Sequence, residues 1–148
     1  MALQQAVGAT IGFVAELPET HDDTGFGALT YETVGKLEGY PDLDGVYDIA
    51  TFTGLDSGEE EKFVDVLRAG NSSFMVGLDP DDAGQTAVET AFRDGTKGSF
   101  EFTLKDGTIY YRTAAITSYN PTNIGVGNVV MADLGLEFEK TTIKVAAP

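Results

Sequence analysis

The sequence predicts a mainly β protein: an antiparallel β-sandwich or partly closed barrel with one short flanking α-helix and a long projecting loop. Three observations support this fold class. Short segments of alternating apolar and polar residues recur along the chain and are separated by turn residues. Only one segment has both helix caps and helical spacing of its apolar residues. Residues 1–148 also suit a single domain in length, and no interdomain linker or repeat is visible.

The composition is that of a compact globular protein. Hydrophobic residues make up 42% of the chain and charged residues 22%, which indicates neither disorder nor a membrane protein. No apolar run approaches the roughly 20 residues that span a bilayer, so we expect no membrane segment. The first 14 residues lack a secretory signal pattern, and we therefore expect synthesis in a cytosol. The absence of cysteine excludes disulfides and thiolate chemistry.

The chain is strongly acidic. Nine basic and twenty-four acidic side chains give a formal net charge of −15, which argues against binding nucleic acid by neutralising its phosphates. Two interpretations are consistent with this charge. The first is solubility, and the second is a surface that DNA must pass without adhering to it.

The first half of the chain contains strand patterns separated by turns. The segment 18–27 reads as a solvated polar loop containing the only histidine, His21, and 39–45 is rich in turn residues. The predicted strands cover residues 9–16, 31–38, 46–53 and 72–78.

One helix is specified by its ends. Asp79 can cap it, Pro80 suits the first helical position, and the following acidic residues complement the positive end of the helix dipole. Val88 and Phe92 lie on one apolar stripe that can pack on a sheet. Gly95 provides a left-handed cap after the last turn. We therefore predict a helix over about 80–94.

A hairpin is predicted over residues 100–113. If Asp106 and Gly107 form a two-residue turn, Lys105 faces Thr108 and the register of the whole ladder follows. Aromatic pairs then lie on the core side, and opposite charges meet on the outer side. The predicted opposite pairs are Leu104 with Ile109, Phe102 with Tyr111 and Phe100 with Thr113 on the core side, and Glu101 with Arg112 and Thr103 with Tyr110 on the other.

Two further strands are predicted near the C-terminus. The segment 128–138 alternates between apolar residues on one face and Asp133 and Glu137 on the other. A separate short strand over 142–145 can add to a sheet edge.

Motifs for catalysis or metal binding are weak. The acidic residues at 79, 81 and 82 are better explained as helix caps than as cation ligands. Asp42 and Asp44 open a pattern like a calcium loop, but Thr53 occupies the twelfth position, where a bidentate glutamate is required. His21 has no second histidine or cysteine to complete a metal site, and no serine lies in a nucleophile-elbow context. An acidic pair for glycoside cleavage stays open because such carboxylates meet only in space. We expect no cofactor, no metal and no enzymatic activity.

The segment 55–70 permits two interpretations. It mixes the acidic run 59–61 with the apolar residues Phe63, Val64, Val66 and Leu67. It can form an amphipathic turn or short helix, capped by Ser57, that folds back on its own domain. Alternatively it is a projecting hairpin loop that inserts its apolar residues into a neighbouring copy, and we favour this reading because long loops in compact domains are often functional.

The order of these elements resembles the major tail tube protein of long-tailed, non-contractile bacteriophages. The resemblance covers about residues 51–138. The residues that carry it are Leu55, Asp56 and Ser57, Gly70, Ser73 and Phe74, Asp79, Pro80, Asp82, Gly84 and Gln85, Phe92, and Asp106, Gly107 and Thr108.

The resemblance implies a structural virion protein that is made in the host cytoplasm and resides in the virion tail. Such subunits form hexameric rings that stack into a hollow tube, through which genome DNA passes without specific binding. The implied partners are other copies of the chain, a tape-measure protein, a tail terminator and distal tail proteins. An N-terminal arm over about 1–10 and a C-terminal tail over about 141–148 would flank the domain.

The resemblance also suggests site residues. The segment 55–70 would bridge to the next ring, and acidic side chains at outward strand positions would line the lumen. The candidates for contact between rings or subunits are Leu55, Asp56, Glu59, Glu60, Phe63, Val66, Leu67 and Arg68. The lumen-lining candidates are Glu32, Glu38, Glu101 and Glu137. The residues expected to define the fold are Asp79, Pro80, Gly95, Asp106 and Gly107.

Other functions remain open at this point. A tail terminator or connector, or a contractile-type injection tube subunit, would share the fold. A secreted carbohydrate-binding β-sandwich or a small hydrolase is disfavoured because the chain lacks a signal peptide, tryptophan for sugar stacking and a catalytic set.

Overall fold

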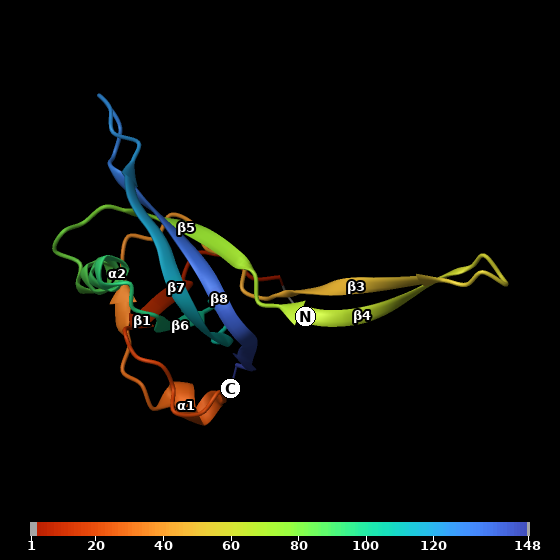
Figure 1. Cartoon of the computed structure of the whole chain (residues 1–148). Coiled ribbons are helices and arrows are strands. Elements are labelled where there is room, and N and C mark those ends of the chain that lie inside the picture. Colours follow the sequence, from red (N-terminus) through yellow and green to blue (C-terminus); the bar gives the residue numbers. More distant parts are fainter. Residues whose placement is uncertain (1–2, 148) are drawn as a thin grey trace.

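A computed structural model describes residues 3–147. A six-stranded sheet with the strand order β2-β1-β6-β7-β8-β5 forms the body, and β3 and β4 form a separate two-stranded sheet that projects from it (Figure 1). Every pair of neighbouring strands is antiparallel. The predicted mainly β fold class with a short flanking helix is confirmed, and the structure adds a second helix, α1, that was not predicted. The strands are β1 Thr10–Val14, β2 Glu32–Val34, β3 Val46–Thr53, β4 Glu60–Arg68, β5 Asn71–Gly77, β6 Gly98–Thr103, β7 Ile109–Thr122 and β8 Met131–Val145, and the helices are α1 Asp23–Gly27 and α2 Ala83–Asp94.

The six-stranded sheet curls until its two edge strands approach each other, but it does not close into a barrel. The residues that follow β2 meet β5 through a single antiparallel bridge between Leu37 and Val76. Next to this bridge, the Glu38 N–H donates to the Met75 carbonyl at 2.9 Å, and the Gly77 N–H donates to the Lys36 carbonyl at 2.8 Å. The chain itself therefore occupies much of the edge that β5 would otherwise present to solvent.

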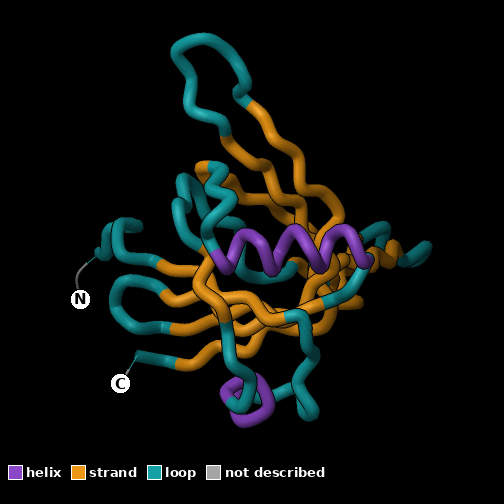
Figure 2. Tube along the Cα trace, turned by 90° about the vertical axis from the view of Figure 1, so that its left-hand side faces the viewer, coloured by secondary structure: helices purple, strands orange, loops and turns teal. Residues whose placement is uncertain are grey.

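The core lies on the concave side of the curled sheet, and α2 covers its open side (Figure 2). Val88 and Ala91 of the predicted helical stripe are buried there against the sheet. The other core side chains come from alternate positions of the six strands, as expected for strands with one buried face. They are Ile11, Phe13, Val34, Phe74, Val76, Phe100, Phe102, Ala114, Ile116, Tyr119, Ala132, Leu134, Leu136 and Phe138.

Helix α2 begins three residues later than predicted. Its N-cap is Asp82, whose carboxylate accepts from the Gln85 N–H at 3.0 Å. Asp79 instead accepts from the Asp81 N–H at 3.0 Å and so forms a turn around Pro80 before the helix. Either aspartate could have capped the helix, and Asp82 also accepts from the backbone N–H of Gly35, the residue after β2. Gly95 ends the helix in a left-handed conformation with φ 69°.

The register predicted for the β6–β7 hairpin is wrong by one residue. The observed partners include Phe102 with Tyr110, Phe100 with Arg112 and Glu101 with Tyr111, so the expected charge pair between Glu101 and Arg112 does not form. The cause is the turn. Leu104 and Thr108 close a three-residue loop, in which Gly107 has φ 97° and the Asp106 carboxylate accepts from the Thr108 N–H.

The apolar pattern could not choose between the two registers because both faces of the sheet are covered at this point. Tyr111 lies on the face opposite the core, where its ring stacks on Phe26 at 5.2 Å between centroids. Arg112 lies on the core face and is fully buried. A slip of one residue therefore exchanges one covered environment for another instead of exposing apolar groups to water.

The segment 18–27 is not a solvated polar loop. It contains α1, capped by Asp22, and it buries Phe26 completely. His21 packs against the Phe26 ring at 5.5 Å, and its Nε2 lies 2.7 Å from the Thr141 carbonyl oxygen. One apolar residue within a polar stretch thus anchors the segment on the outer face of the sheet.

The C-terminal third forms a longer hairpin than predicted. The two strands expected over 128–138 and 142–145 are one strand, β8, which continues through an irregularity at Lys140, where φ is 59°. Strand β7 extends to Thr122, beyond the predicted hairpin. The described residues before β1 and after β8 form neither helix nor strand. Residues 1 and 2 of the predicted N-terminal segment and residue 148 of the predicted C-terminal tail lie outside the described part.

Candidate functional site

The β3–β4 hairpin, here called the arm, extends away from the body (Figure 1). Strand β3 has the predicted bounds. The segment 55–70 belongs to a projecting hairpin, as the favoured reading expected, but most of it is strand β4 and not loop. The alternative of a short helix capped by Ser57 is therefore wrong. An isolated two-stranded hairpin is marginally stable in water, so an arm of this length calls for a surface to pack on.

Both faces of the arm carry apolar side chains. Residues that are direct partners in a ladder point to the same face. Ile49 is paired with Val64 on one face, and Ala50 is paired with Phe63 on the other. Phe63 is 55% exposed although it is apolar, and no other element covers either face among the described residues. The large exposed apolar side chains of the arm are Val46, Tyr47, Ile49, Phe52, Leu55, Phe63, Val64 and Val66.

The predicted contact residues are spread along the arm. Leu55 and Asp56 lie at its tip, and Leu55 is fully exposed. Leu67 is half-buried near the base, where it is paired with Tyr47. Arg68 forms an ion pair with Asp48 of β3 at 2.5 Å. The remaining candidates, Glu59, Glu60, Phe63 and Val66, are exposed.

The base of the arm is held by Arg112, a residue of the body. Its guanidinium donates to the Leu43 carbonyl at 3.2 Å and to the Ala69 carbonyl at 3.1 Å, which lie just before β3 and just after β4. A third hydrogen bond, 3.3 Å long, reaches the Lys140 carbonyl at the irregularity of β8. One buried cation therefore joins the two ends of the arm to the sheet.

The four predicted lumen-lining acids do not share one face. Glu137 is exposed on the face opposite the core, where its partner across β7 is Ala115. Glu32 is the partner of Phe13 and therefore lies on the core face, at the sheet edge. Glu38 is exposed beside Met75 at the junction of the two edges.

Glu101 lies on the same face as Glu137 but is half-buried. It sits close to Tyr31 and Tyr111, and both of these tyrosines contact Phe26 of α1. Burial, together with this carboxylate, raises the pKa of Tyr111 above its usual value. The open part of this face therefore offers Glu137 to solvent or to a partner, and the half-buried Glu101 and Asp133 less.

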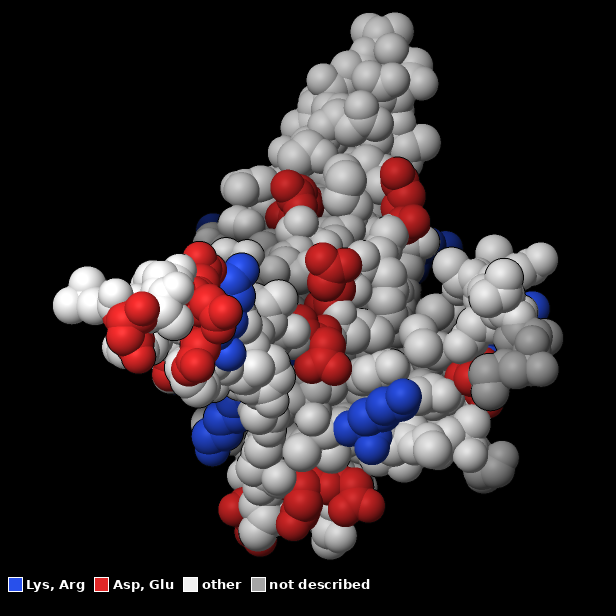
Figure 3. Space-filling model, turned by 90° about the vertical axis from the view of Figure 1, so that its right-hand side faces the viewer, with Lys and Arg blue, Asp and Glu red and all other residues white. Residues whose placement is uncertain are grey.

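The side of the molecule opposite α2 carries many acidic groups (Figure 3). They come from the body and from the arm, and the few basic side chains in view are scattered among them. Within residues 3–147, no group of three or more histidine, cysteine or acidic side chains is arranged to hold a metal ion. The acidity is thus a property of a surface and not of a compact coordination site.

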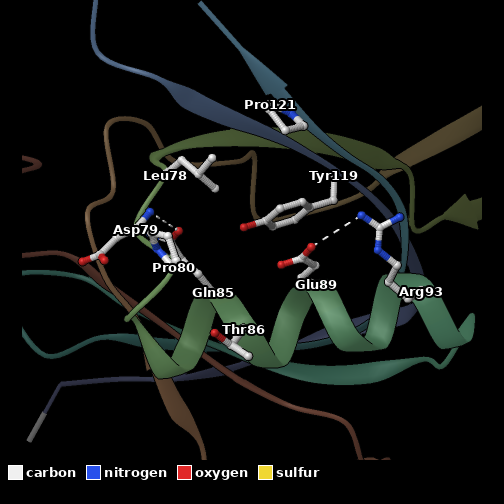
Figure 4. A pocket seen from close by; sticks show the side chains of 9 residues that line it. All are labelled: Leu78, Asp79, Pro80, Gln85, Thr86, Glu89, Arg93, Tyr119 and Pro121. Carbon is white, nitrogen blue, oxygen red and sulfur yellow. Dashed lines mark hydrogen bonds and ion pairs between the residues drawn. The ribbon is translucent and has the colours of Figure 1, made fainter. Parts of the chain in front are cut away.

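A groove of about 190 Å³ lies between α2 and the end of β7 (Figure 4). It is smaller than the roughly 300–1,000 Å³ typical of small-molecule sites. Glu89 and Arg93 form an exposed ion pair at 3.5 Å along one wall, and the Tyr119 ring forms part of the other. Gln85 at its floor is buried and occupied by backbone contacts, so the groove offers no free reactive group there.

Sequence reasoning missed the roles of Arg112 and Gln85. Arg112 stood in an apparent outer position of a hairpin and was assigned to a surface charge pair. Gln85 was identified only as part of a motif, and its contacts link segments that are far apart in sequence. The signal available was the position of Gln85, which lies three residues before Val88 and seven before Phe92, on the apolar stripe of the helix.

Comparison with known proteins gives a similarity of structure but not of sequence. No family model matches the chain, and no curated protein matches it. Among solved structures, the tail of an empty GTA particle superposes with a TM-score of 0.71 and 20% identity, covering 97% of this chain and 100% of that one. The chain has the fold of tail tube proteins.

Two further structures have the same fold. The tube-terminating cap of the anti-feeding prophage matches with a TM-score of 0.62 and 15% identity, covering 99% of this chain and 95% of its own. The sheath/tube terminator of the extracellular contractile injection system PVC matches with a TM-score of 0.64 and 11% identity over 99% of both chains. These neighbours are structural components of tails and tail-like particles. In the part of this chain that is described, no helix is long and apolar enough to cross a membrane.

Proposed function

We propose that the chain is the major tail tube subunit of a long-tailed bacteriophage. Copies form hexameric rings, and the rings stack into a hollow tube that delivers genome DNA to the host. The observation that carries this proposal is the arm, a two-stranded hairpin with apolar side chains exposed on both faces, on a body with the tail tube fold. Sixfold rings are favoured because the GTA tail was determined with C6 symmetry.

The arm supplies the contact between rings. Its backbone edges are open on both sides, since β3 and β4 pair only with each other. Open edges can accept a further strand, and the apolar faces lose contact with water when they pack against another copy. By contrast, the two edges of the body sheet meet each other near Leu37 and Val76, so they are less available for pairing.

The acidic surface supplies a wall to which DNA does not adhere. Duplex DNA carries one negative charge per roughly 1.7 Å of its axis. In a lumen only slightly wider than DNA, the phosphates pass within about one Debye length of the wall, near 8–10 Å at cellular salt. Exposed acids such as Glu137 then repel the phosphates. On this proposal the protein acts without enzymatic activity and its partners are the tape-measure, terminator and distal tail proteins.

The test is negative-stain electron microscopy of the purified protein over a series of concentrations. We expect long hollow tubes of constant diameter from the wild type. Phe63→Ser with Leu67→Ser removes an apolar side chain from each face of the arm and is expected to leave rings that do not stack. Lys62→Ser, an exposed polar position on the same strand, is the matched control and should still give tubes. A protein that stays monomeric under all conditions contradicts the proposal.

A tail terminator is the second candidate. Two of the structural neighbours are a tube-terminating cap and a sheath/tube terminator, and both align over nearly the whole chain. A terminator closes the end of a tube and does not repeat along it. Single rings of the wild type that never polymerise would select this function over the tube subunit.

A further inference from the structure

The hairpin between β7 and β8 has a tip without charged residues. Residues 113–132 contain no aspartate, glutamate, lysine or arginine, although 22% of the whole chain is charged. The tip of this hairpin, residues 123–130, extends beyond the body in a different direction from the arm (Figure 1). The space-filling view shows a projection free of charged atoms above the acidic surface (Figure 3).

Apolar side chains of the tip face solvent. Ile124 is 73% exposed, Val129 is 71% exposed, and Val126 is completely exposed at 106%. In a chain with a net charge of −15, solubility alone would favour polar or acidic residues at such a position. A cluster of exposed apolar residues on a projection is typical of an interaction surface.

The tip is also held in one shape by its own hydrogen bonds. The Asn128 N–H donates to the Gly125 carbonyl at 3.2 Å, and the Asn123 side chain donates to the Val129 carbonyl at 3.0 Å across the loop. Gly127 adopts φ 82°, which a residue with a side chain would reach at a cost. A loop that is ordered in advance loses less conformational entropy when it binds.

We propose that this tip, residues 123–130, docks onto a second copy of the same chain and forms a self-contact distinct from that of the arm. Two copies that each carry a charge of −15 repel one another, so contact between them is favoured where neither acids nor bases are brought together. Stacked rings, on which this inference rests, also need two different contacts, one within a ring and one between rings. The arm provides the contact between rings, and the tip provides the contact within a ring.

A lipid surface is a less favourable binding partner for the tip than a second copy of the chain. Cytoplasmic membrane surfaces are negatively charged, and proteins that bind them carry clusters of lysine and arginine. The tip has none, and acidic groups lie beneath it. A second copy also carries acids, but it offers its own apolar arm and tip surfaces for burial.

The absence of native cysteine allows a site-specific probe at the tip. Val126→Cys, labelled with an environment-sensitive fluorophore, reports burial of the tip as the protein concentration rises. Thr96→Cys, an exposed position just after α2, is the matched control. We expect the emission at position 126 to shift to shorter wavelength upon assembly and the emission at position 96 to stay constant.

A charge at the tip should block the contact. We expect Val126→Asp to weaken self-association at least tenfold in analytical ultracentrifugation, and Thr96→Asp, which adds the same charge elsewhere, to leave it unchanged. Because Val126 is completely exposed, its substitution leaves the fold intact, which circular dichroism verifies.

The outcomes separate this inference from the proposed function. Tubes in which the probe at position 126 stays in water, or in which Val126→Asp has no effect, overturn the tip contact and leave the tube function standing. A discrete oligomer that buries the probe but never forms tubes supports the tip contact and overturns the tube function. A shift caused only by anionic vesicles, or no self-association at any concentration, overturns the tip contact.

Discussion

The carboxylate of Asp82 accepts a hydrogen bond from the Gly35 N–H at 3.0 Å, and so joins the start of α2 to the end of β2. Gln85, one turn into the helix, completes the junction. Its side-chain amide donates to the Gly35 carbonyl at 3.0 Å and to the Gly77 carbonyl at 2.8 Å, while its oxygen accepts from the Asp79 N–H at 3.0 Å. Gly35 follows β2 and Gly77 ends β5, so the helix start holds the two edges of the curled sheet together.

Gln85→Leu is expected to destabilise the subunit. The side chain is buried, and its loss leaves two carbonyls and one N–H without partners at a cost of roughly 1–3 kcal/mol for each buried group. Water reaches part of the segment 77–79, so the total cost is lower than the sum over the three groups. We expect the free energy of unfolding to fall by about 2–4 kcal/mol in chemical denaturation. Thr90→Leu, at an exposed position of the same helix, should change the free energy of unfolding by less than about 0.5 kcal/mol. Equal stability of wild type and Gln85→Leu would refute this role.

Arg112→Met should loosen the arm as well as the body. The methionine keeps the packing on Phe138, whose ring centre lies 4.2 Å from the guanidinium carbon, but it removes the three hydrogen bonds to backbone carbonyls. We expect a loss of about 3 kcal/mol in the free energy of unfolding. Amide hydrogen exchange should become faster around the pair Val46 and Arg68, where the ladder of the arm begins.

Arg68→Met is the control for the arginine substitution. Its ion pair with Asp48 is exposed, so the expected change is about 0–1 kcal/mol. If both arginine variants showed the same small effect, Arg112 would not anchor the arm.

Asp106→Ala should give a stability difference that depends on pH. The hydrogen bond from the Thr108 N–H is the main cause that holds the pKa of Asp106 below its ordinary value of 3.8. A carboxyl with a lowered pKa in the folded state stabilises the fold above its unfolded pKa, and this contribution is lost as the pH falls through the folded pKa. Thermal melts at pH 7 should therefore show a lower midpoint for the variant, with the gap narrowing below pH 3.8. A gap that widens on acidification would be contrary to this account.

Reversing the charge of lumen candidates should slow DNA release from assembled particles. Glu137→Lys, combined with Glu101→Lys, replaces repulsion of the phosphates by attraction, while the tubes stay intact. Because Glu137 is exposed and Glu101 is half-buried, the single Glu137→Lys variant should account for most of the effect. The readout is the rate of DNA ejection, with Glu32→Lys on the other face as the control. Unchanged ejection by the double variant would count against an acidic lumen.

Local signals predicted the elements whose ends are defined by neighbouring residues. The helix end at Gly95, strand β3 and the apolar face of β8 follow from capping, turn residues and alternation, which act over a few residues. The register at Phe102 and Tyr110 could not be predicted, because Phe26 and Tyr31 cover the second face from a distant part of the chain. For the same reason the assignment of Arg112 to the surface failed.

By itself, the sequence determined the mainly β class, the capped helix α2 and an acidic chain without cysteine, since each depends on composition or short-range spacing. Only the tertiary structure decided that residues 60–68 of the projecting segment form a strand, that Arg112 lies beneath the base of the arm, and that Gln85 joins the two sheet edges. These features arise from contacts between residues far apart in the chain. Such contacts depend on how the sheet curls, and local sequence patterns do not predict that curvature.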